Sequence, residues 1–199
     1  MGYLENIQVA LAVLAMAIGG RMLTRRQPWP GLWLRMWVVL IVLGCLYIAG
    51  EELSWGQHLL HWRTPGWMEQ VNDQGETNIH NISSWFDQKP RFLLELGILV
   101  GGVLRPLWVA WRAQGQRVRP MTRATWLWPT FVCVPTGILA EMSRWPDRIA
   151  EWVGHDIQFV SLRHSEVQEY FIGLFIIIYL LSLKVRLGAV TPISGAQRG

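Results

Sequence analysis

Five long blocks of apolar residues constrain the fold of this chain more than any other feature of its sequence. They lie near residues 4–22, 33–53, 91–111, 125–143 and 165–184. A helix needs about 20 mostly apolar residues to cross the hydrocarbon core of a bilayer, and each block approaches that length. Only 16% of the 199 residues are charged, whereas a soluble domain usually has about 25%. The sequence therefore predicts an all-α, polytopic membrane helix bundle of about five transmembrane helices, forming one domain over residues 1–199.

The basic residues predict the orientation of these helices. Residues 21–35, 105–123 and 184–198 contain twelve Arg and Lys and no acid. Lys and Arg collect in cytoplasmic loops, and these three segments alternate with the remaining loops. All 14 Asp and Glu and all five His fall at or near the opposite side. We therefore expect a multi-pass protein with its N-terminus outside and its C-terminus in the cytoplasm.

Two connections on the outer side contain apolar residues at helical spacing. In "NIHNISSWF", residues 78–86, Ile79, Ile82 and Phe86 fall on one face, and "WPDRIAEWV", residues 145–153, has a similar pattern. Short helices of this kind lie in the plane of the membrane interface with their apolar face inward. We expect two such interfacial helices.

The stretch "GEELSWGQHLLHW", residues 50–62, places two carboxylates at the end of the second block. A carboxylate at membrane depth is costly and normally faces protein, water or a partner charge. In a continuous helix, Glu51, Ser54, Trp55 and His58 share one face, and Glu52 is turned aside. Glu166 and Glu169 begin the last block with the same i, i+3 relationship. These carboxylates are expected at one height in the bundle.

The outer loop "NDQGETNIHN", residues 72–81, adds further polar groups. Glu76 and His80 are four residues apart, and Asn78 lies between them. Carboxylate, imidazole and amide groups that converge in this way suit a divalent cation, zinc or calcium. The expected metal ligands are Glu51, Glu52, Glu76, His80, Glu166 and Glu169. In a catalytic site, Glu51 or Glu76 would activate water, and Gln57 and Asn78 would orient the substrate.

A simpler alternative is that arginines neutralise these acids. Candidate partners are Arg63, Arg91, Arg144, Arg148 and Arg163, with Glu141 and Arg144 at i, i+3 spacing. In that case the chain would be a non-enzymatic accessory or assembly subunit of a larger membrane protein complex. A transporter is weaker, because the inner halves of the blocks lack a charged relay. The basic residues suit membrane lipid headgroups, and no nucleic-acid partner is expected.

The motifs "GEELSWGQ", "TPGW", "QGETNIHN" and "SEVQEYF" resemble those of a group of uncharacterised bacterial integral membrane proteins. The resemblance covers about half of the chain and implies the inner, cytoplasmic membrane of a bacterium. A basic residue is more common in the group where this chain has His58. The matching residues are Glu51, Glu52, Ser54, Trp55, Gln57, Glu76, Asn78, His80, Asn81, Glu166 and Glu169.

A second, weaker similarity is to alkaline-ceramidase-like membrane hydrolases, which hold zinc and acidic residues at a membrane face. This chain departs from them, because it has five blocks rather than seven and no HxxxH in the last one. The analogy implies what such a cavity can do. The leading functional hypothesis is a metal-dependent hydrolase that acts on a lipid or other amphiphile at the outer leaflet.

Overall fold

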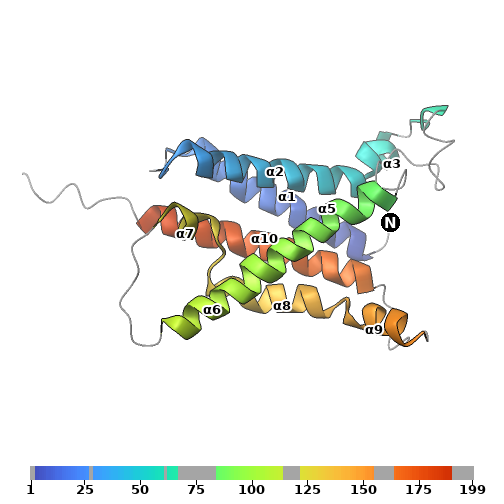
Figure 1. The fold of residues 1–199 in the computed structure, drawn as a ribbon. Coiled ribbons are helices and arrows are strands. Elements are labelled where there is room, and N and C mark those ends of the chain that lie inside the picture. Colours follow the sequence, from blue (N-terminus) through green and yellow to red (C-terminus); the bar gives the residue numbers. More distant parts are fainter. Residues whose placement is uncertain are drawn as a thin grey trace, which may run out of the picture.

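The computed structural model describes residues 3–26, 29–60, 62–66, 84–113, 122–154 and 164–189. This part of the chain is helical and contains no strand (Figure 1). Four helices in it are long and apolar enough to cross a membrane, namely Asn6–Thr24, Leu32–Glu52, Arg91–Arg112 and His164–Ala189. The all-α fold class is confirmed, and four of the five apolar blocks form continuous helices of the kind that a membrane protein needs.

Helix α10 (His164–Ala189) joins the two halves of the bundle (Figure 1). It packs against α1 (Tyr3–Thr24), which in turn packs against α2 (Leu32–Glu52), and it also packs against α8 (Val134–Met142). Two buried apolar clusters result. The first includes Ala15, Leu34, Val38, Leu180 and Leu183. The second includes Ile98, Cys133, Ala140, Ile172 and Phe175. Because α10 contributes to both clusters, it fixes α1 and α2 relative to α8.

The third apolar block changes its winding along its length. It consists of α5 (Ser84–Gly97), the π-helix η3 (Ile98–Leu104) and α6 (Arg105–Arg112). The π-helical part approaches its neighbours closely. A Cβ atom at Gly102 would lie 2.4 Å from the Phe175 ring, and one at Gly101 would lie 2.9 Å from the Trp128 ring. Only glycine permits these two contacts without displacing an aromatic ring.

The fourth predicted span, residues 125–143, is not one continuous helix, which corrects the sequence-based expectation. Helix α7 (Arg123–Leu127) ends before Pro129, and the chain resumes as the 3-10 helix η4 (Phe131–Cys133) followed by α8. Trp128 is extended, with φ −75° and ψ 137°. A residue before proline is driven out of the helical region, and proline itself donates no backbone hydrogen bond. Pro129 therefore interrupts the block near its start.

Side chains of α10 bond to the backbone carbonyls at this interruption. Tyr179 donates its hydroxyl to the Leu127 carbonyl oxygen at 2.7 Å. Arg186 donates from Nη1 to the Thr125 carbonyl at 3.0 Å. In an apolar surrounding each such carbonyl needs a partner. Arg186 had been expected in a cytoplasmic tail, but α10 continues to Ala189 and places it within the bundle.

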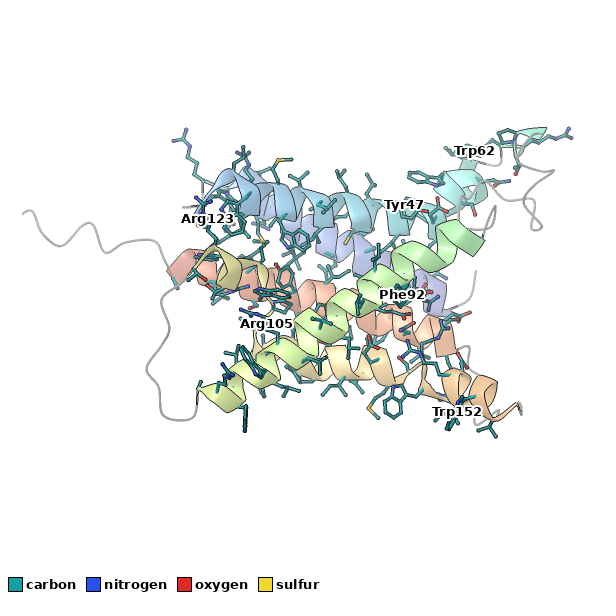
Figure 2. All side chains as sticks on the ribbon, in the orientation of Figure 1. Tyr47, Trp62, Phe92, Arg105, Arg123 and Trp152 are labelled. Atoms are coloured by element: carbon teal, nitrogen blue, oxygen red, sulfur yellow. The ribbon has the colours of Figure 1, made fainter. Side chains whose placement is uncertain are left out.

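One of the two short helices expected on the outer side lies among the described residues. Helix α9 (Trp145–Val153) ends at Gly154, which adopts the left-handed conformation with φ 70°. Trp152 of α9 is 91% exposed and points away from the bundle (Figure 2), and Ile149 is also exposed. These apolar residues are free to contact lipid. The other expected helix, near residues 79–86, lies mostly outside the described residues, and from Ser84 onward the chain belongs to α5.

The described carboxylates lie at one end of the bundle. The start of α1, the end of α2 and the starts of α5 and α10 share this end, at the right of Figure 1. We call it the carboxylate end. It contains Glu51, Glu52, Glu95, Glu141, Glu166 and Glu169. The arginine pattern predicts that this end faces the outside of the cell.

Candidate functional site

The "GEELSWGQ" motif forms a tight left-handed turn at the carboxylate end. Helix α2 ends at Glu52, and the 3-10 turn η1 (Ser54–Gly56) leads into α3 (Gln57–Leu60). Ser54, Trp55 and Gly56 have φ values of 46°, 52° and 93°. Positive φ is uncommon for residues other than glycine. The expected helical face that includes Glu51, Ser54 and His58 is therefore wrong, because the helix ends before Ser54.

The turn returns the Trp55 side chain to the end of α2. Its indole nitrogen Nε1 donates to Oε1 of Glu51 at 2.6 Å. Its ring lies against Gly50, where a Cβ atom would come within 2.9 Å of the ring carbons. The ring of Tyr47 meets that of Trp55 edge-on, with centroids 6.4 Å apart. Gly50, Glu51 and Trp55 thus form one structural unit that fixes the position of the Glu51 carboxylate.

Gln57 also has a local structural partner. Its amide nitrogen donates to Oγ1 of Thr64 at 2.9 Å. This bond connects the "GQ" end of the first motif with the "TP" turn, and Thr64 is buried. The bond links the two motifs, and the role of Gln57 in orienting a substrate stays a prediction.

A cavity of about 340 Å³ lies beside this turn, between α1, α2, α5 and α10. Its polar wall consists of Gln8, Glu51, Glu52, Arg91 and Glu169. The rest of its wall is mostly apolar and includes Leu11, Ala15, Tyr47, Ile48, Leu94 and Ile172. Glu51 is only 5% exposed. The fold thus brings three of the six expected metal ligands, Glu51, Glu52 and Glu169, to the wall of one cavity.

Arg91 is the main counter-charge in this cavity. Its Nη1 lies 2.8 Å from Oε1 of Glu169, and its Nη2 donates to Oε1 of Gln168 at 2.9 Å. The same Nη2 donates to the Ser165 carbonyl at 3.1 Å. Its Nε lies 3.5 Å from Glu95, one turn later on α5. Arg91 therefore contacts three residues at the start of α10, and one of these contacts is an ion pair with the Glu169 carboxylate.

A second arginine continues this network away from the cavity. Arg148 of α9 lies 3.1 Å from Glu95 and 3.8 Å from Glu141. The expected Glu141–Arg144 pair is replaced, because the Arg144 guanidinium lies 3.7 Å from Asp147 instead. Asp147 also contacts Nδ1 of His164 at 2.6 Å. Arg148 is thus the ion-pair partner of both Glu95 and Glu141. This is the kind of pairing that the simpler alternative predicts for the acids at this end.

The remaining expected site residues fall into two groups. Glu166 opens α10 but does not line the cavity, although its backbone carbonyl accepts a hydrogen bond from Gln8 at 3.1 Å. Glu76, Asn78 and His80 lie outside the described residues. Among the side chains that the structure describes, no group of three or more His, Cys, Asp or Glu residues could hold a metal ion. A zinc or calcium site that includes Glu76 and His80 stays a prediction.

A larger apolar cavity adjoins the first one. Its volume is about 690 Å³, and it lies between α2, the third block, the α7–η4 break and α10. The two cavities share the wall residues Gly44, Cys45, Ile48, Leu94 and Ile176. The farther wall is aromatic and consists of Trp37, Trp128, Phe175 and Tyr179. Together the cavities have a charged end and a long apolar end.

Sequence reasoning missed this second cavity because no charged residue lines it. Gly44 and Gly97 line it and were the available indications, since glycine has no side chain to fill the space beside the backbone. Searches with this chain against family models, curated proteins and solved structures found no match. The geometry of the two cavities is therefore the basis for a functional assignment.

Proposed function

We propose that this protein is an integral membrane protein that binds one amphiphile within its helix bundle. The polar group of the amphiphile lies against Glu51 and Glu52, and its hydrocarbon chain lies along the apolar wall. The observation that supports this proposal is the adjoining pair of cavities, one with charged residues and one almost entirely apolar. Ligand sites usually combine an apolar wall with a few convergent polar groups, and they commonly enclose about 300–1,000 Å³.

The charges of the first cavity indicate the kind of head group. Its wall has the carboxylates of Glu51, Glu52 and Glu169 and the guanidinium of Arg91. Arg91 already contacts Glu169 and Glu95. Because the wall holds three carboxylates and one guanidinium, a cationic or hydrogen-bond-donating head group is favoured over an anionic one, which the excess of carboxylates would repel in a medium of low dielectric constant. An amine or a hydroxyl-rich amine has the required chemistry.

The site is proposed to open toward the outer leaflet of a bacterial inner membrane. The support is the excess of basic residues without acids in three alternating segments of the sequence. These segments are expected on the cytoplasmic side, opposite the carboxylate end. The amphiphile would then enter laterally from the outer leaflet, between helices whose outward faces are apolar.

Binding of the head group is testable with two amphiphiles of equal chain length. In purified protein, native mass spectrometry should detect one bound dodecylamine and little dodecanoate. Glu51→Gln should weaken dodecylamine binding about tenfold, because a charge-assisted hydrogen bond contributes on the order of 1.5–3 kcal/mol. Glu52→Gln should have a smaller effect, because Glu52 is less buried than Glu51.

Glu166→Gln is the matched control, since Glu166 lies at the same end but lines neither cavity. Equal binding of dodecanoate, or an equal loss in the control variant, would contradict the proposal. Failure of both amphiphiles to bind would favour the accessory-subunit alternative.

Hydrolysis of the bound amphiphile, assisted by a metal, is the finer proposal. Its support is that Glu51 is buried in the cavity wall and fixed by Trp55, as a group that activates water must be. A metal ligated also by Glu76 and His80 would polarise the bond to be cleaved. Elemental analysis should find zinc or calcium in the purified protein and much less in His80→Ala. Equal metal content in both would contradict the metal site.

A further inference from the structure

Two arginines of α6 stack on tryptophan rings at the end of the bundle opposite the carboxylates. The guanidinium carbon of Arg105 lies 4.7 Å from the centre of the Trp128 ring, and that of Arg112 lies 4.3 Å from the centre of the Trp108 ring. Both α6 and α7, which precedes Trp128, lie away from the carboxylate end (Figure 1). A guanidinium over the face of an indole ring is attracted to it. Each stack therefore holds one guanidinium plane in place.

Neither of these arginines has an acidic partner among the described residues. Their guanidinium groups make no ion pair and no hydrogen bond within that part of the chain. The arginines of the carboxylate end differ, because Arg91 pairs with Glu169 and Arg148 with Glu95. Residues 105–123 contain no Asp or Glu, and neither do residues 21–35 and 184–198, which border the same end. The positive charge of α6 is therefore available to an anion from outside the chain.

The two arginines share one face of α6 with Trp108. Arg105, Trp108 and Arg112 stand at positions i, i+3 and i+7 of the helix, and such positions lie on one side. Side chains of a helix lean toward its N-terminus, and the Arg112–Trp108 stack accordingly directs the Arg112 guanidinium toward Arg105. We call these three residues the arginine–tryptophan face. Leu107 and Trp111 beside it are exposed, so the face is bordered by side chains that can contact lipid.

The arginine–tryptophan face lies near the boundary between hydrocarbon and head groups. Arg105 and Arg112 come 14 and 21 residues after Arg91, which corresponds to about 20 Å and about 30 Å of helix. The hydrocarbon core is about 30 Å thick. An arginine near this boundary extends its charged group to the interface, where tryptophan is also common. The phosphates of that leaflet are therefore within reach of both guanidinium groups.

We propose that the arginine–tryptophan face binds the phosphate of one anionic phospholipid. The arginine pattern assigns the lipid to the cytoplasmic leaflet. Stacking on a ring leaves the N–H edge of a guanidinium free, and this edge can donate two parallel hydrogen bonds to a phosphate. A phospholipid with net negative charge is favoured over a zwitterionic one, whose ammonium group already compensates its phosphate. This site is separate from the cavity at the carboxylate end and does not depend on the proposed function.

The test compares two phospholipids that differ in head-group charge. The full chain is placed in nanodiscs with equal amounts of phosphatidylglycerol and phosphatidylcholine, and native mass spectrometry identifies the lipid that stays bound. The wild type should retain one phosphatidylglycerol. Arg112→Gln should lower the ratio of phosphatidylglycerol to phosphatidylcholine about fivefold, the factor expected for one basic residue at a membrane surface. Arg112→Lys should lose most of the preference although it keeps the charge, because an ammonium group cannot form the parallel pair of bonds.

Arg25→Gln is the matched control. Arg25 follows α1 at the same end of the bundle and is exposed, as Arg112 is. Among the described residues it stacks on no aromatic ring. Its replacement removes the same charge and should leave the lipid preference unchanged. Thermal unfolding should show wild-type midpoints for the variants at both positions. Glycerol phosphate, which has the phosphate without the hydrocarbon chains, should not displace the bound lipid.

Each outcome decides for or against the site. If Arg112→Lys keeps the full preference, or if Arg25→Gln lowers it as much as Arg112→Gln does, only the overall positive charge attracts the lipid and the inference is wrong. Displacement by glycerol phosphate would also overturn it, since the site would then suit a soluble phosphate compound. Glu51→Gln should not change the lipid ratio, so the failure of this site and the failure of the amphiphile cavity are distinguishable.

Discussion

The guanidinium of Arg91 lies 2.8 Å from the carboxylate of Glu169, and this ion pair joins α5 to α10 at the wall of the smaller cavity. The pair occurs where the third and last apolar blocks begin, so it also fixes the distance between them. Because Arg91 contacts Glu95 as well, its loss would leave two carboxylates without this partner. The pair therefore offers a direct test of what holds the carboxylate end together.

Replacement of Arg91 should destabilise the protein more than replacement of any exposed arginine. We expect Arg91→Gln to lower the free energy of unfolding by roughly 1–3 kcal/mol, because it removes the ion pair with Glu169 and the hydrogen bonds to Gln168 and to the Ser165 carbonyl, whereas Glu95 keeps Arg148 as a partner. The measurement is the midpoint of thermal unfolding in detergent. Arg63→Gln, at an exposed position, should have little effect. If Glu169→Gln in the Arg91→Gln background restores no stability, the two residues are not coupled.

Gly50→Ala should displace Trp55 from Glu51. The added Cβ would come within 2.9 Å of the indole ring, and the resulting overpacking should cost about 1–3 kcal/mol. Without the clash, alanine would stabilise a helix by about 1 kcal/mol relative to glycine. The matched variant Gly20→Ala, which borders open space, should show that gain. The measurement is the midpoint of thermal unfolding of both variants. Equal stabilisation by the two substitutions would contradict the close contact between Gly50 and the Trp55 ring.

Tyr179→Phe should weaken the bundle at the end opposite Glu51. The hydroxyl of Tyr179 accepts from Trp37 and donates to the Leu127 carbonyl. Its removal leaves both groups without this partner, and each buried unsatisfied group costs about 1–3 kcal/mol. Tyr170→Phe on the same helix serves as the control. A loss of stability no greater than that of the control would show that water or lipid replaces the hydroxyl.

The orientation of the protein is testable by cysteine labelling in intact cells. Both native cysteines, Cys45 and Cys133, are buried, so they should contribute little background. Gly75→Cys should react with a membrane-impermeant thiol reagent, and Gln116→Cys should react only after the cells are opened. The reason is the excess of basic residues around Gln116 and of acidic residues around Gly75. The reverse pattern would invert the proposed topology and place the cavity on the cytoplasmic side.

The sequence predicted the features that depend on composition and spacing. Apolar blocks of sufficient length indicated the long helices, and α2 ends within one residue of the expected position. The interruption at Pro129 was also predictable in principle, because Trp128 and Pro129 stand inside the fourth block. The prediction of a helix over residues 125–143 followed from the high hydropathy of that block. It did not take into account that a helix cannot continue regularly through Pro129.

The features that depend on tertiary contacts could not be predicted in this way. The left-handed turn at Ser54 and Trp55 is unfavourable for the isolated residues, and the Trp55–Glu51 bond and the Gly50 contact stabilise it. The choice of Arg91 rather than Arg144 as the partner of a cavity carboxylate depends on how the helices are rotated about their axes. A single sequence gives each helix a polar face, but it does not give the angle between two such faces.

The π-helix between Ile98 and Leu104 has a consequence for the rotation of the third block. Its wider winding takes up residues without advancing the helix face as an α-helix would. Arg91 above it contacts Glu169, and Arg105 below it lies over Trp128. If the same residues instead wound as a regular α-helix, these two arginines would be turned relative to each other by about 100°. The π-helix therefore fixes the rotation between the two ends of the third block, so that Arg91 can contact Glu169 while Arg105 contacts Trp128.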